Sequence, residues 1–527
     1  MSDRTILVPV DGASNIKLEA LDFETLATAH SAATASPTAE HDGLACNATG
    51  EEFDWFDEAI GAMPAGLRNA AVVAPVARGA SGGLVGPDNT LLEAGDRRLT
   101  LAYTQPFGDE VDDVFREIAG SREAFFEETG SIRDLPGSLT LLKRFVFEQR
   151  TRPALVAAAA GFAHYGALLG GHFLGGDYLE AIRQAGNEHS YWMCHSGTRN
   201  VRAEPGTPSA AAGRVEAFGR LVPSAPTVCY RPLGTMPAAQ ADALGLDRPP
   251  VVIPGGHDTC LSHLPILSTF YQAFPAAAGK PVLHVEAGTW TMIALVAGRV
   301  ELPADGYRRD VLIQGTVDGG AVVTARYGGG ADFTHGMALA RSRGAGFEPA
   351  DDHARLGRLL AAADCFVLPN GAPANRGTGP FPDASGRIVN EPAFFADPID
   401  AYLATNLMTA MTTACQVEGI CPDASVPIVL TAGGSKDPLF ATLLATLTAR
   451  AVYAMFDGTG QAVTETTTLG AAIAGKAACL GVHPHDVDTT ALGVRFRRIE
   501  GLSAALSAAL EAYRARWREL VDADVSR

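Results

Sequence analysis

Ile253-Pro254-Gly255-Gly256-His257-Asp258-Thr259 lies close to the middle of the chain and joins an apolar run to two titratable side chains. Residues 251–253 predict a buried strand, and the two glycines allow the backbone to turn tightly after it. The turn then presents an imidazole beside a carboxylate. An ordinary solvated loop has the same composition, so the surrounding chain must decide between the two interpretations. We predict that Asp258 is a catalytic base.

Composition excludes several classes of function. The chain has 527 residues, 47% hydrophobic and 19% charged, which exceeds one hydrophobic core and predicts two domains. A formal net charge of -18 argues against a nucleic-acid partner. The eight cysteines form no CxxC pair, so they predict neither a disulfide framework nor a zinc site.

Targeting and membrane signals are weak. The N-terminus shows no signal-peptide pattern, and we expect a cytoplasmic protein without a membrane partner. The apolar stretch at residues 154–176 is mostly Ala and Gly and carries two histidines, which favours close helix packing over a membrane span.

The N-terminus predicts a hairpin. Residues 5–10 and 16–22 read as two strands around a small polar tip. Backbone N–H groups of such a tip, with donors from Ser14, Asn15 and Lys17, can surround a phosphate, although this segment taken alone favours a plain surface turn.

Two further segments offer substrate contacts. A strand-like run at residues 70–76 leads into small residues around Arg78 and Gly79, where the Arg either enters a cleft or is solvated. Residues 187–198 gather two histidines, two aromatic residues and several hydroxyls. In this segment His195 either contacts substrate or packs, because the spacing of the two histidines matches no recognised metal site.

The second half of the chain repeats the strand, tip and strand pattern. Residues 282–287 and 291–296 predict the strands, and Gly288, Thr289 and Trp290 form the tip. Two halves that each begin with a hairpin suggest two similar domains, each offering a tip to a shared cleft.

A nucleotide-binding site is predicted near residue 435. A strand at residues 427–430 leads into a glycine-rich turn, and Pro438 follows Asp437 at the start of a helix. An Asp N-cap before a first-turn Pro is a strong helix start, and it leaves backbone N–H groups and Gly434 facing a ligand. The loop-like run at residues 470–476 lacks the final Ser or Thr of a phosphate loop, so we interpret it as helix.

In this order the motifs resemble those of the FGGY family of carbohydrate kinases, over roughly residues 5–480. The resemblance rests on five segments: residues 255–259 resemble the catalytic-aspartate turn, 431–439 the adenosine motif, 288–290 the second phosphate motif, 12–17 the first phosphate hairpin, and 465–472 the helix after the adenosine motif.

The resemblance implies an α/β fold of two actin-like (ribonuclease H-like) domains with an interdomain active-site cleft that closes on ATP and a sugar or polyol. We expect a sugar-binding N-terminal domain at residues 1–256, a nucleotide-binding C-terminal domain at 257–490, and a C-terminal helix at 491–527 that packs on the core.

The family's roles carry over to matching positions. The implied catalytic base is Asp258, with Asp11 and Asp258 as Mg²⁺ ligands. The residues expected to contact ATP are Gly12, Ser14, Asn15, Lys17, Gly288, Thr289, Gly433, Gly434, Ser435 and Asp437. The residues expected on the substrate side are Arg78, Gly79, His195, His257 and Trp290. Phosphoryl transfer needs both substrates held in position, Mg²⁺ to neutralise phosphate charge, and one carboxylate to accept the hydroxyl proton. The residues implied by the resemblance would meet these three needs.

One position departs from the family pattern. The hairpin aspartate of the family falls at Val10, and the nearby carboxylate, Asp11, is one residue later. Successive strand residues point to opposite faces, so Asp11 reaches the metal only if the turn is remodelled. Otherwise this chain binds Mg-ATP differently, weakly or not at all.

The predicted activity is ATP-dependent phosphorylation of a ketose, deoxyketose or polyol. The deoxy-sugar branch is favoured because the segments at residues 255–258 and 288–290 look closer to rhamnulokinase and fuculokinase. The alternative, from another class, is a non-catalytic sugar or nucleotide sensor on the same fold. A homodimer is compatible with either.

Overall fold

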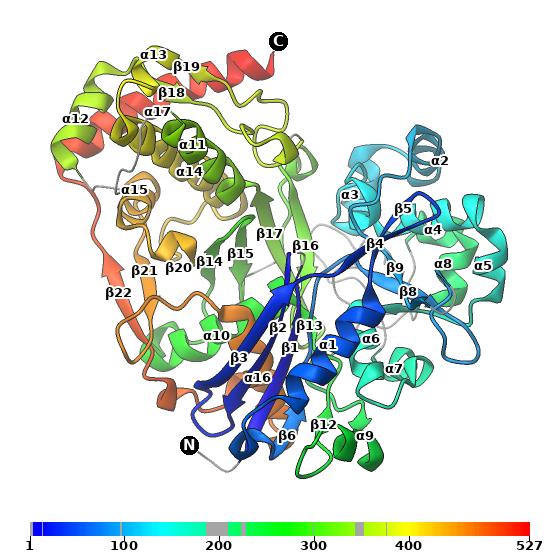
Figure 1. Ribbon diagram of the computed structural model, residues 1–527. Coiled ribbons are helices and arrows are strands. Elements are labelled where there is room, and N and C mark those ends of the chain that lie inside the picture. The colour runs from blue at the N-terminus through cyan, green and yellow to red at the C-terminus, as the bar shows by residue number, and fades with distance from the viewer. Residues whose placement is uncertain are drawn as a thin grey trace. The chain divides into compact units, whose positions relative to one another are not determined.

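The computed structural model describes residues 4–12, 14–94, 97–185, 209–222, 228–298, 300–342, 352–375 and 377–526. The chain forms two compact units (Figure 1). Unit 1 comprises Met1–Phe274, Ile313–Ala321 and Glu465–Gly493, and unit 2 comprises Pro275–Leu312, Val322–Thr464 and Val494–Arg527. Residues 257–274 and 465–490, which the sequence prediction placed in the C-terminal domain, therefore pack within unit 1.

Unit 1 contains an eight-stranded sheet that begins with the predicted hairpin. Its strands are β1 (Thr5–Asp11), β2 (Asn15–Asp22), β3 (Thr28–Ala35), β6 (Ala70–Val73), β7 (Val76–Ala77), β11 (Gly234–Thr235), β12 (Val251–Val252) and β13 (Gly256–His257). β1 pairs antiparallel with β2 and parallel with β6 and β7, and β12 and β13 continue the parallel part. The hairpin and the central strand are confirmed.

Helices cover both faces of this sheet, because side chains alternate along its strands. Leu7 packs with α1 (Thr49–Gly61) and α6 (Tyr165–His172) in one buried cluster. Ile6 lies on the opposite face, where Gly475 of α16 (Thr466–Leu480) approaches it. The loop-like run at residues 470–476 lies inside α16, so its interpretation as helix is confirmed.

A second core in unit 1 lies outside the main sheet. Its elements are β5 (Leu44–Asn47), β8 (Gly82–Val85), β9 (Thr100–Leu101), β10 (Gly161–His164), α2 (Asp109–Ala119), α3 (Arg122–Thr129), α4 (Leu141–Thr151), α5 (Pro153–Ala158) and α8 (Glu216–Leu221). Beside it, β4 (Thr38–His41) pairs antiparallel with β5. The remaining helices of unit 1 are α7 (Tyr178–Ala185), α9 (Ala238–Ala243) and α10 (Asp258–Ala273). Residues 154–176 divide among α5, β10 and α6, and no helix in the described ranges is long and apolar enough to cross a membrane.

Buried ion pairs tie this second core together. Arg144 Nη2 lies 2.8 Å from Glu93 Oε1, and Glu148 lies between Arg144 and Arg152. Burial raises the pKa of Glu93 to about 7, although Arg144 opposes this shift and Glu148 adds to it. The folded state therefore holds a proton on Glu93 at a pH where the unfolded chain has released it.

This shift predicts the pH dependence of stability. Because the folded pKa is raised, the folded state binds more protons than the unfolded state between the ordinary pKa of 4.5 and about 7, so stability falls as pH rises through that window. The loss amounts to about 3 kcal/mol, and Glu93→Gln should remove it. Urea midpoints from pH 4 to 8 measure the slope, with the exposed Glu117→Gln as control. An unchanged slope in Glu93→Gln would contradict the assignment.

Unit 2 is built around a seven-stranded sheet, of which residues 313–315 and 321 at one edge are counted in unit 1. Its strands, in spatial order, are β16 (Val311–Gly315), β17 (Ala321–Tyr327), β15 (Thr291–Val296), β14 (Val282–Ala287), β20 (Ile428–Ala432), β21 (Val452–Phe456) and β22 (Arg495–Ile499). β14 and β15 form the second predicted hairpin, and β20 is the strand predicted at residues 427–430, so both predictions are confirmed. The structure adds that β14 runs parallel to β20.

Helices and a small hairpin complete unit 2. They are α11 (Gly329–Arg341), α12 (His353–Ala362), α13 (Glu391–Phe394), α14 (Pro398–Ile420), α15 (Pro438–Thr448), α17 (Ala504–Val525), β18 (Phe366–Val367) and β19 (Ile388–Val389). In α17, Tyr513 donates to the carbonyl of Cys365 at 2.6 Å and Trp517 to that of Val367 at 2.9 Å. The terminal helix therefore packs within unit 2 through buried aromatic side chains, whereas residues 495–499, inside the range predicted as a terminal helix, form β22.

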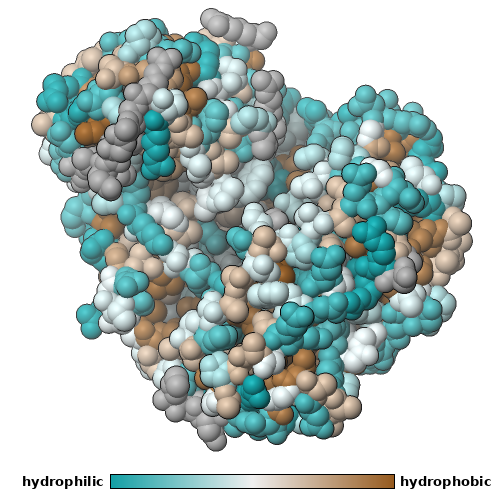
Figure 2. All heavy atoms as spheres, viewed as in Figure 1, coloured by the Kyte–Doolittle hydropathy of each residue, from teal (hydrophilic) through white to brown (hydrophobic). Residues whose placement is uncertain are grey.

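Polar and apolar residues are mixed over the face of the molecule shown in Figure 2, where brown residues form small clusters among teal ones. The exposed large hydrophobic side chains include Trp290, at 38% exposure, on the β14–β15 turn.

Candidate active site

The catalytic turn predicted from the sequence connects β12 to α10. Gly255 has φ +64, and a Cβ there would lie 1.8 Å from the carbonyl oxygen of Pro75. Only glycine combines this left-handed backbone with so close an approach. The chain then pairs with β7 through Gly256 and His257, and Asp258 becomes the first residue of α10.

Gly255→Ala is expected to lower the free energy of unfolding by about 2–4 kcal/mol, from backbone strain at positive φ and from the steric overlap. Gly176→Ala is the matched control, because Gly176 also has positive φ but a Cβ there would meet nothing within 4 Å. Urea unfolding measures both variants. Equal losses in the two would mean that the contact with Pro75 contributes nothing.

Asp258 is an accessible, ionised carboxylate. Its side chain is 52% exposed, and its Oδ1 lies 2.9 Å from His257 Nε2 and accepts the Thr259 N–H at 2.7 Å. Desolvation raises its pKa, but the nearby His257 and the Thr259 N–H outweigh this, so its pKa lies below the ordinary value. The start of a helix also favours negative charge. Asp258 is therefore ready to accept a proton at neutral pH.

His257 is brought to Asp258 by a second glycine. A Cβ on Gly79 would lie 2.4 Å from two atoms of the His257 ring, so glycine at 79 leaves room for the imidazole. The structure thus brings together Gly79, His257 and Asp258, which the sequence placed on two separate segments. His195 lies outside the described residues.

The first hairpin closes tightly. Gly12 N–H donates to the Asn15 carbonyl at 3.1 Å, and Ser14 and Asn15 are exposed. Lys17 Nζ lies 2.7 Å from Glu465 Oε2 and 3.0 Å from Glu19 Oε1. Desolvation lowers the pKa of Lys17, but these carboxylates raise it further, so Lys17 stays charged.

Asp11 lies on the other face of the hairpin from Lys17, whose partner in the register is Val10. It is buried and ion-paired with Arg78, whose Nε lies 2.6 Å from Oδ1 and 2.8 Å from Oδ2. Arg78 Nη1 also donates to Asn47 at 3.0 Å. The guanidinium is committed to buried side chains, which leaves it little capacity to contact a substrate.

Glu52 completes this buried cluster, and no sequence pattern pointed to it. Its Oε2 accepts the Tyr165 hydroxyl at 2.8 Å and lies 3.5 Å from Arg78 Nη2. Burial raises the pKa of Glu52 well above its ordinary range, and the charge of Asp11 adds to the rise. A protonated Glu52 leaves one carboxylate, Asp11, to balance Arg78.

A cavity of about 360 Å³ lies within unit 2, where the sequence predicts a nucleotide-binding site. Its lining includes five of the predicted ATP contacts: Gly288, Thr289, Gly433, Gly434 and Asp437. Side chains that the sequence did not single out complete it: Thr291, Phe333, Thr334, Asn406, Thr409 and Phe440. Asn406 and Thr409 lie in α14, a helix with many apolar residues. Polar residues within such a helix are the sequence feature that could have indicated a binding site there.

The predicted helix start is confirmed beside this cavity. Asp437 accepts the N–H groups of Leu439 and Phe440 at 3.0 and 3.1 Å, and the Tyr402 hydroxyl at 3.0 Å. Ser435 instead donates to the carbonyl of Ala432, so its hydroxyl braces the turn. Trp290 stacks near Arg326, with 5.7 Å from its ring centroid to the guanidinium carbon.

Residues 280–479 match the family description "Carbohydrate kinase FGGY, C-terminal domain". This segment contains the cavity and its glycine-rich walls. This part of the chain is thereby identified as a C-terminal domain of the FGGY carbohydrate kinase type. No curated protein matches the chain in sequence.

Solved structures share the FGGY fold over the whole chain. A carbohydrate kinase from Novosphingobium aromaticivorans superposes with a TM-score of 0.74 at 20% identity, and a xylulose kinase from Lactobacillus acidophilus with 0.73 at 13%. Glycerol kinase from Plasmodium falciparum, solved with ADP, has a TM-score of 0.70 at 11% identity. Each alignment covers 99% of this chain and 98% of the other. The predicted α/β fold with two actin-like domains is confirmed.

Of the two carboxylates predicted to bind the Mg²⁺ that FGGY kinases use with ATP, only one is suited to do so. Mg²⁺ prefers one or two carboxylates together with substrate phosphates and water. Asp258 fits, because its carboxylate is accessible, whereas Asp11 does not, because Arg78 engages both its oxygens. Among the described residues, no cluster of three or more His, Cys, Asp or Glu side chains could hold a metal.

Proposed function

We propose that this FGGY protein transfers the γ-phosphoryl group of ATP to a hydroxyl group of a small sugar or polyol, with Asp258 as general base. The observation that carries the proposal is the Asp258 carboxylate: accessible, ionised, at the start of α10 and fixed through one oxygen by His257 and Thr259. The other oxygen is the one that we assign to the substrate hydroxyl. A ketose, deoxyketose or polyol is the proposed substrate class.

In this mechanism the substrate hydroxyl gives its proton to Asp258 as its oxygen bonds to the γ-phosphorus, and the bond from that phosphorus to the β–γ bridging oxygen breaks to release ADP. His257 orients the carboxylate, and the accessible side of Asp258 is where a bound Mg²⁺, which neutralises phosphate charge, would be held. The cavity of unit 2 supports nucleotide binding: its glycines let backbone N–H groups approach phosphates, and Phe333 and Phe440 offer apolar surface to a base. Phosphoryl transfer depends mainly on such positioning.

Coupled ADP release across a panel of ketoses, deoxyketoses and polyols tests the proposal. We expect one class to give turnover with ATP and Mg²⁺ that far exceeds the ATPase background. Absence of turnover over the whole panel, while a sugar still raises the melting temperature, would reject the kinase proposal.

The buried Asp11–Arg78 pair favours a second candidate, a sensor that binds sugar or nucleotide without catalysis. In such a protein the hairpin carboxylate serves the fold and not a metal. Nucleotide affinity would then be independent of Mg²⁺. Isothermal titration of ADP with Mg²⁺ and with EDTA separates the candidates, because a kinase should bind more tightly with the metal.

A further inference from the structure

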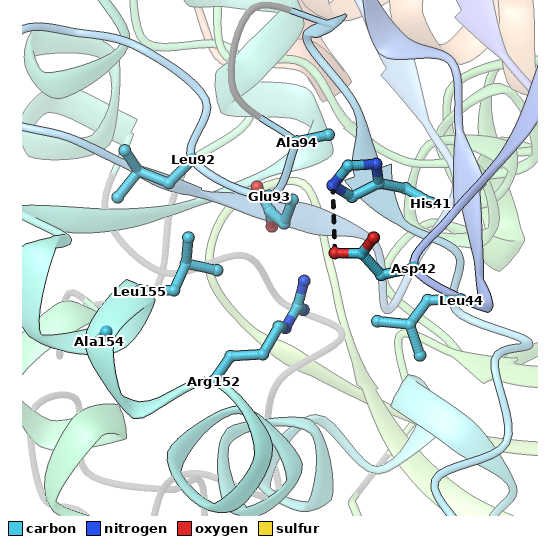
Figure 3. A pocket seen from close by; sticks show the side chains of 9 residues that line it. All are labelled: His41, Asp42, Leu44, Leu92, Glu93, Ala94, Arg152, Ala154 and Leu155. Carbon is cyan, nitrogen blue, oxygen red and sulfur yellow. Dashed lines mark ion pairs between the residues drawn. The ribbon is translucent and has the colours of Figure 1, made fainter.

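A second cavity, of about 400 Å³, lies in unit 1 between the β4–β5 turn and the junction of α4 with α5. Leu44, Leu92 and Leu155 form much of its wall, Glu93 contributes a buried carboxyl group and Arg152 a partly exposed guanidinium (Figure 3). At the rim, His41 Nε2 lies 3.6 Å from the exposed Asp42. None of its residues belongs to the predicted active site. Its volume is within the range of small-molecule sites.

Two polar atoms at this cavity have no hydrogen-bond partner among the described residues. Glu93 is 5% exposed; its Oε1 accepts the Leu84 N–H at 2.9 Å and pairs with Arg144, but its Oε2 accepts nothing. Arg152 Nε is likewise buried and unpartnered, although its Nη2 pairs with Glu148. Figure 3 shows the Glu93 carboxyl group and the Arg152 guanidinium directed into the cavity. Buried polar groups usually have partners, so these two atoms point to a ligand.

The chemistry of the wall defines that ligand. Leucine side chains favour an apolar body. An anion would meet Glu93 and Asp42, and a cation would meet Arg152, so the two signs of charge disfavour an ionic ligand. At pH 8, where the Glu93 carboxylate is ionised, its Oε2 is a free acceptor and Arg152 Nε a free donor, so the two atoms call for one donor and one acceptor on the same head group.

We propose that this cavity binds a small neutral molecule with an apolar body and a hydrogen-bonding head group of the carboxamide type. The head group donates to Glu93 Oε2 and accepts from Arg152 Nε, while the body packs against the leucines. The site is independent of the proposed kinase reaction and uses none of its residues.

Benzamide tests this assignment against three molecules of similar shape: toluene, benzoate and benzamidine. Binding to the full chain is measured by isothermal titration and by melting temperature at pH 8, where the Glu93 carboxylate is ionised. We expect benzamide to bind at least tenfold more tightly than the other three and to raise the melting temperature by about 2 °C at ten times its Kd. Equal binding of toluene would refute the polar selection, and tighter binding of benzoate or benzamidine would refute the neutral ligand.

A matched pair of variants on α5 locates the site. Ala154 lines the cavity and Ala157 does not, and both are exposed. Ala154→Phe is expected to weaken benzamide binding at least tenfold by filling the cavity, whereas Ala157→Phe should leave it unchanged. A crystal structure with benzamide between Leu92 and Leu155 would support the proposal; benzamide found elsewhere, or binding that survives Ala154→Phe with benzamide still absent from the cavity, would overturn it.

Discussion

Asp258→Asn is expected to lower kcat for sugar phosphorylation by about 10³-fold, within the range for loss of a general base. The amide has nearly the same shape and can still accept the Thr259 N–H through its oxygen, so the start of α10 should be preserved. What is lost is the negative charge that receives the hydroxyl proton. Coupled ADP release measures kcat, and isothermal titration of ADP measures nucleotide affinity.

The nucleotide result separates catalysis from folding. Affinity for ADP should stay within about twofold of the wild type, because the cavity of unit 2 does not include Asp258. Asp109→Asn is the matched control: Asp109 is also an exposed first residue of a helix in unit 1, and its variant should keep full activity. Turnover that persists in Asp258→Asn would show that another group is the base.

The sequence predicted the structure correctly where neighbouring residues alone determine it. Asp437 before Pro438 predicted a capped helix start, and both N–H groups that the cap should satisfy are satisfied. The strand alternation of the first hairpin predicted that Asp11 and Val10 point to opposite faces, and the register places them so. Such features depend on residues a few positions apart.

The sequence failed where partners are distant along the chain. Glu52 lies in α1 beside other acidic residues, so it reads as part of a solvated helix face, yet it is fully buried against Tyr165. Arg78 reads as a cleft residue after a strand, yet it meets Asp11, 67 positions earlier. Only tertiary packing decides which of these charges are buried, because each alone is typical of a surface.

Arg78→Met is expected to destabilise unit 1 by about 3–5 kcal/mol, because it leaves the buried carboxylate of Asp11 without its cation. Methionine keeps much of the volume, so the loss reports charge and hydrogen bonding more than a cavity. The exposed Arg231→Met is the control, and it should change stability by less than about 0.5 kcal/mol. Urea unfolding measures both variants.

The pH dependence identifies Asp11 as the cause. Burial raises the pKa of Asp11 even with Arg78 present, and loss of Arg78 removes the main interaction that opposes this rise. The folded variant therefore binds more protons than the unfolded chain above the ordinary pKa of 3.8, over a wider pH range than the wild type. Stability of the variant should therefore fall as pH rises from 4 to 7, more steeply than that of the wild type.

A double variant gives the decisive comparison. Asp11→Asn together with Arg78→Met removes both charges, so it should recover part of the lost stability and return the extra pH slope to the wild-type value. If Asp11 instead bound Mg²⁺, the double variant would lose metal-dependent turnover and would be no more stable than Arg78→Met. The expected result is that the double variant regains free energy of unfolding while the Mg²⁺ dependence of ADP release stays unchanged. That result would establish that Asp11 stabilises the fold and that other groups bind the metal.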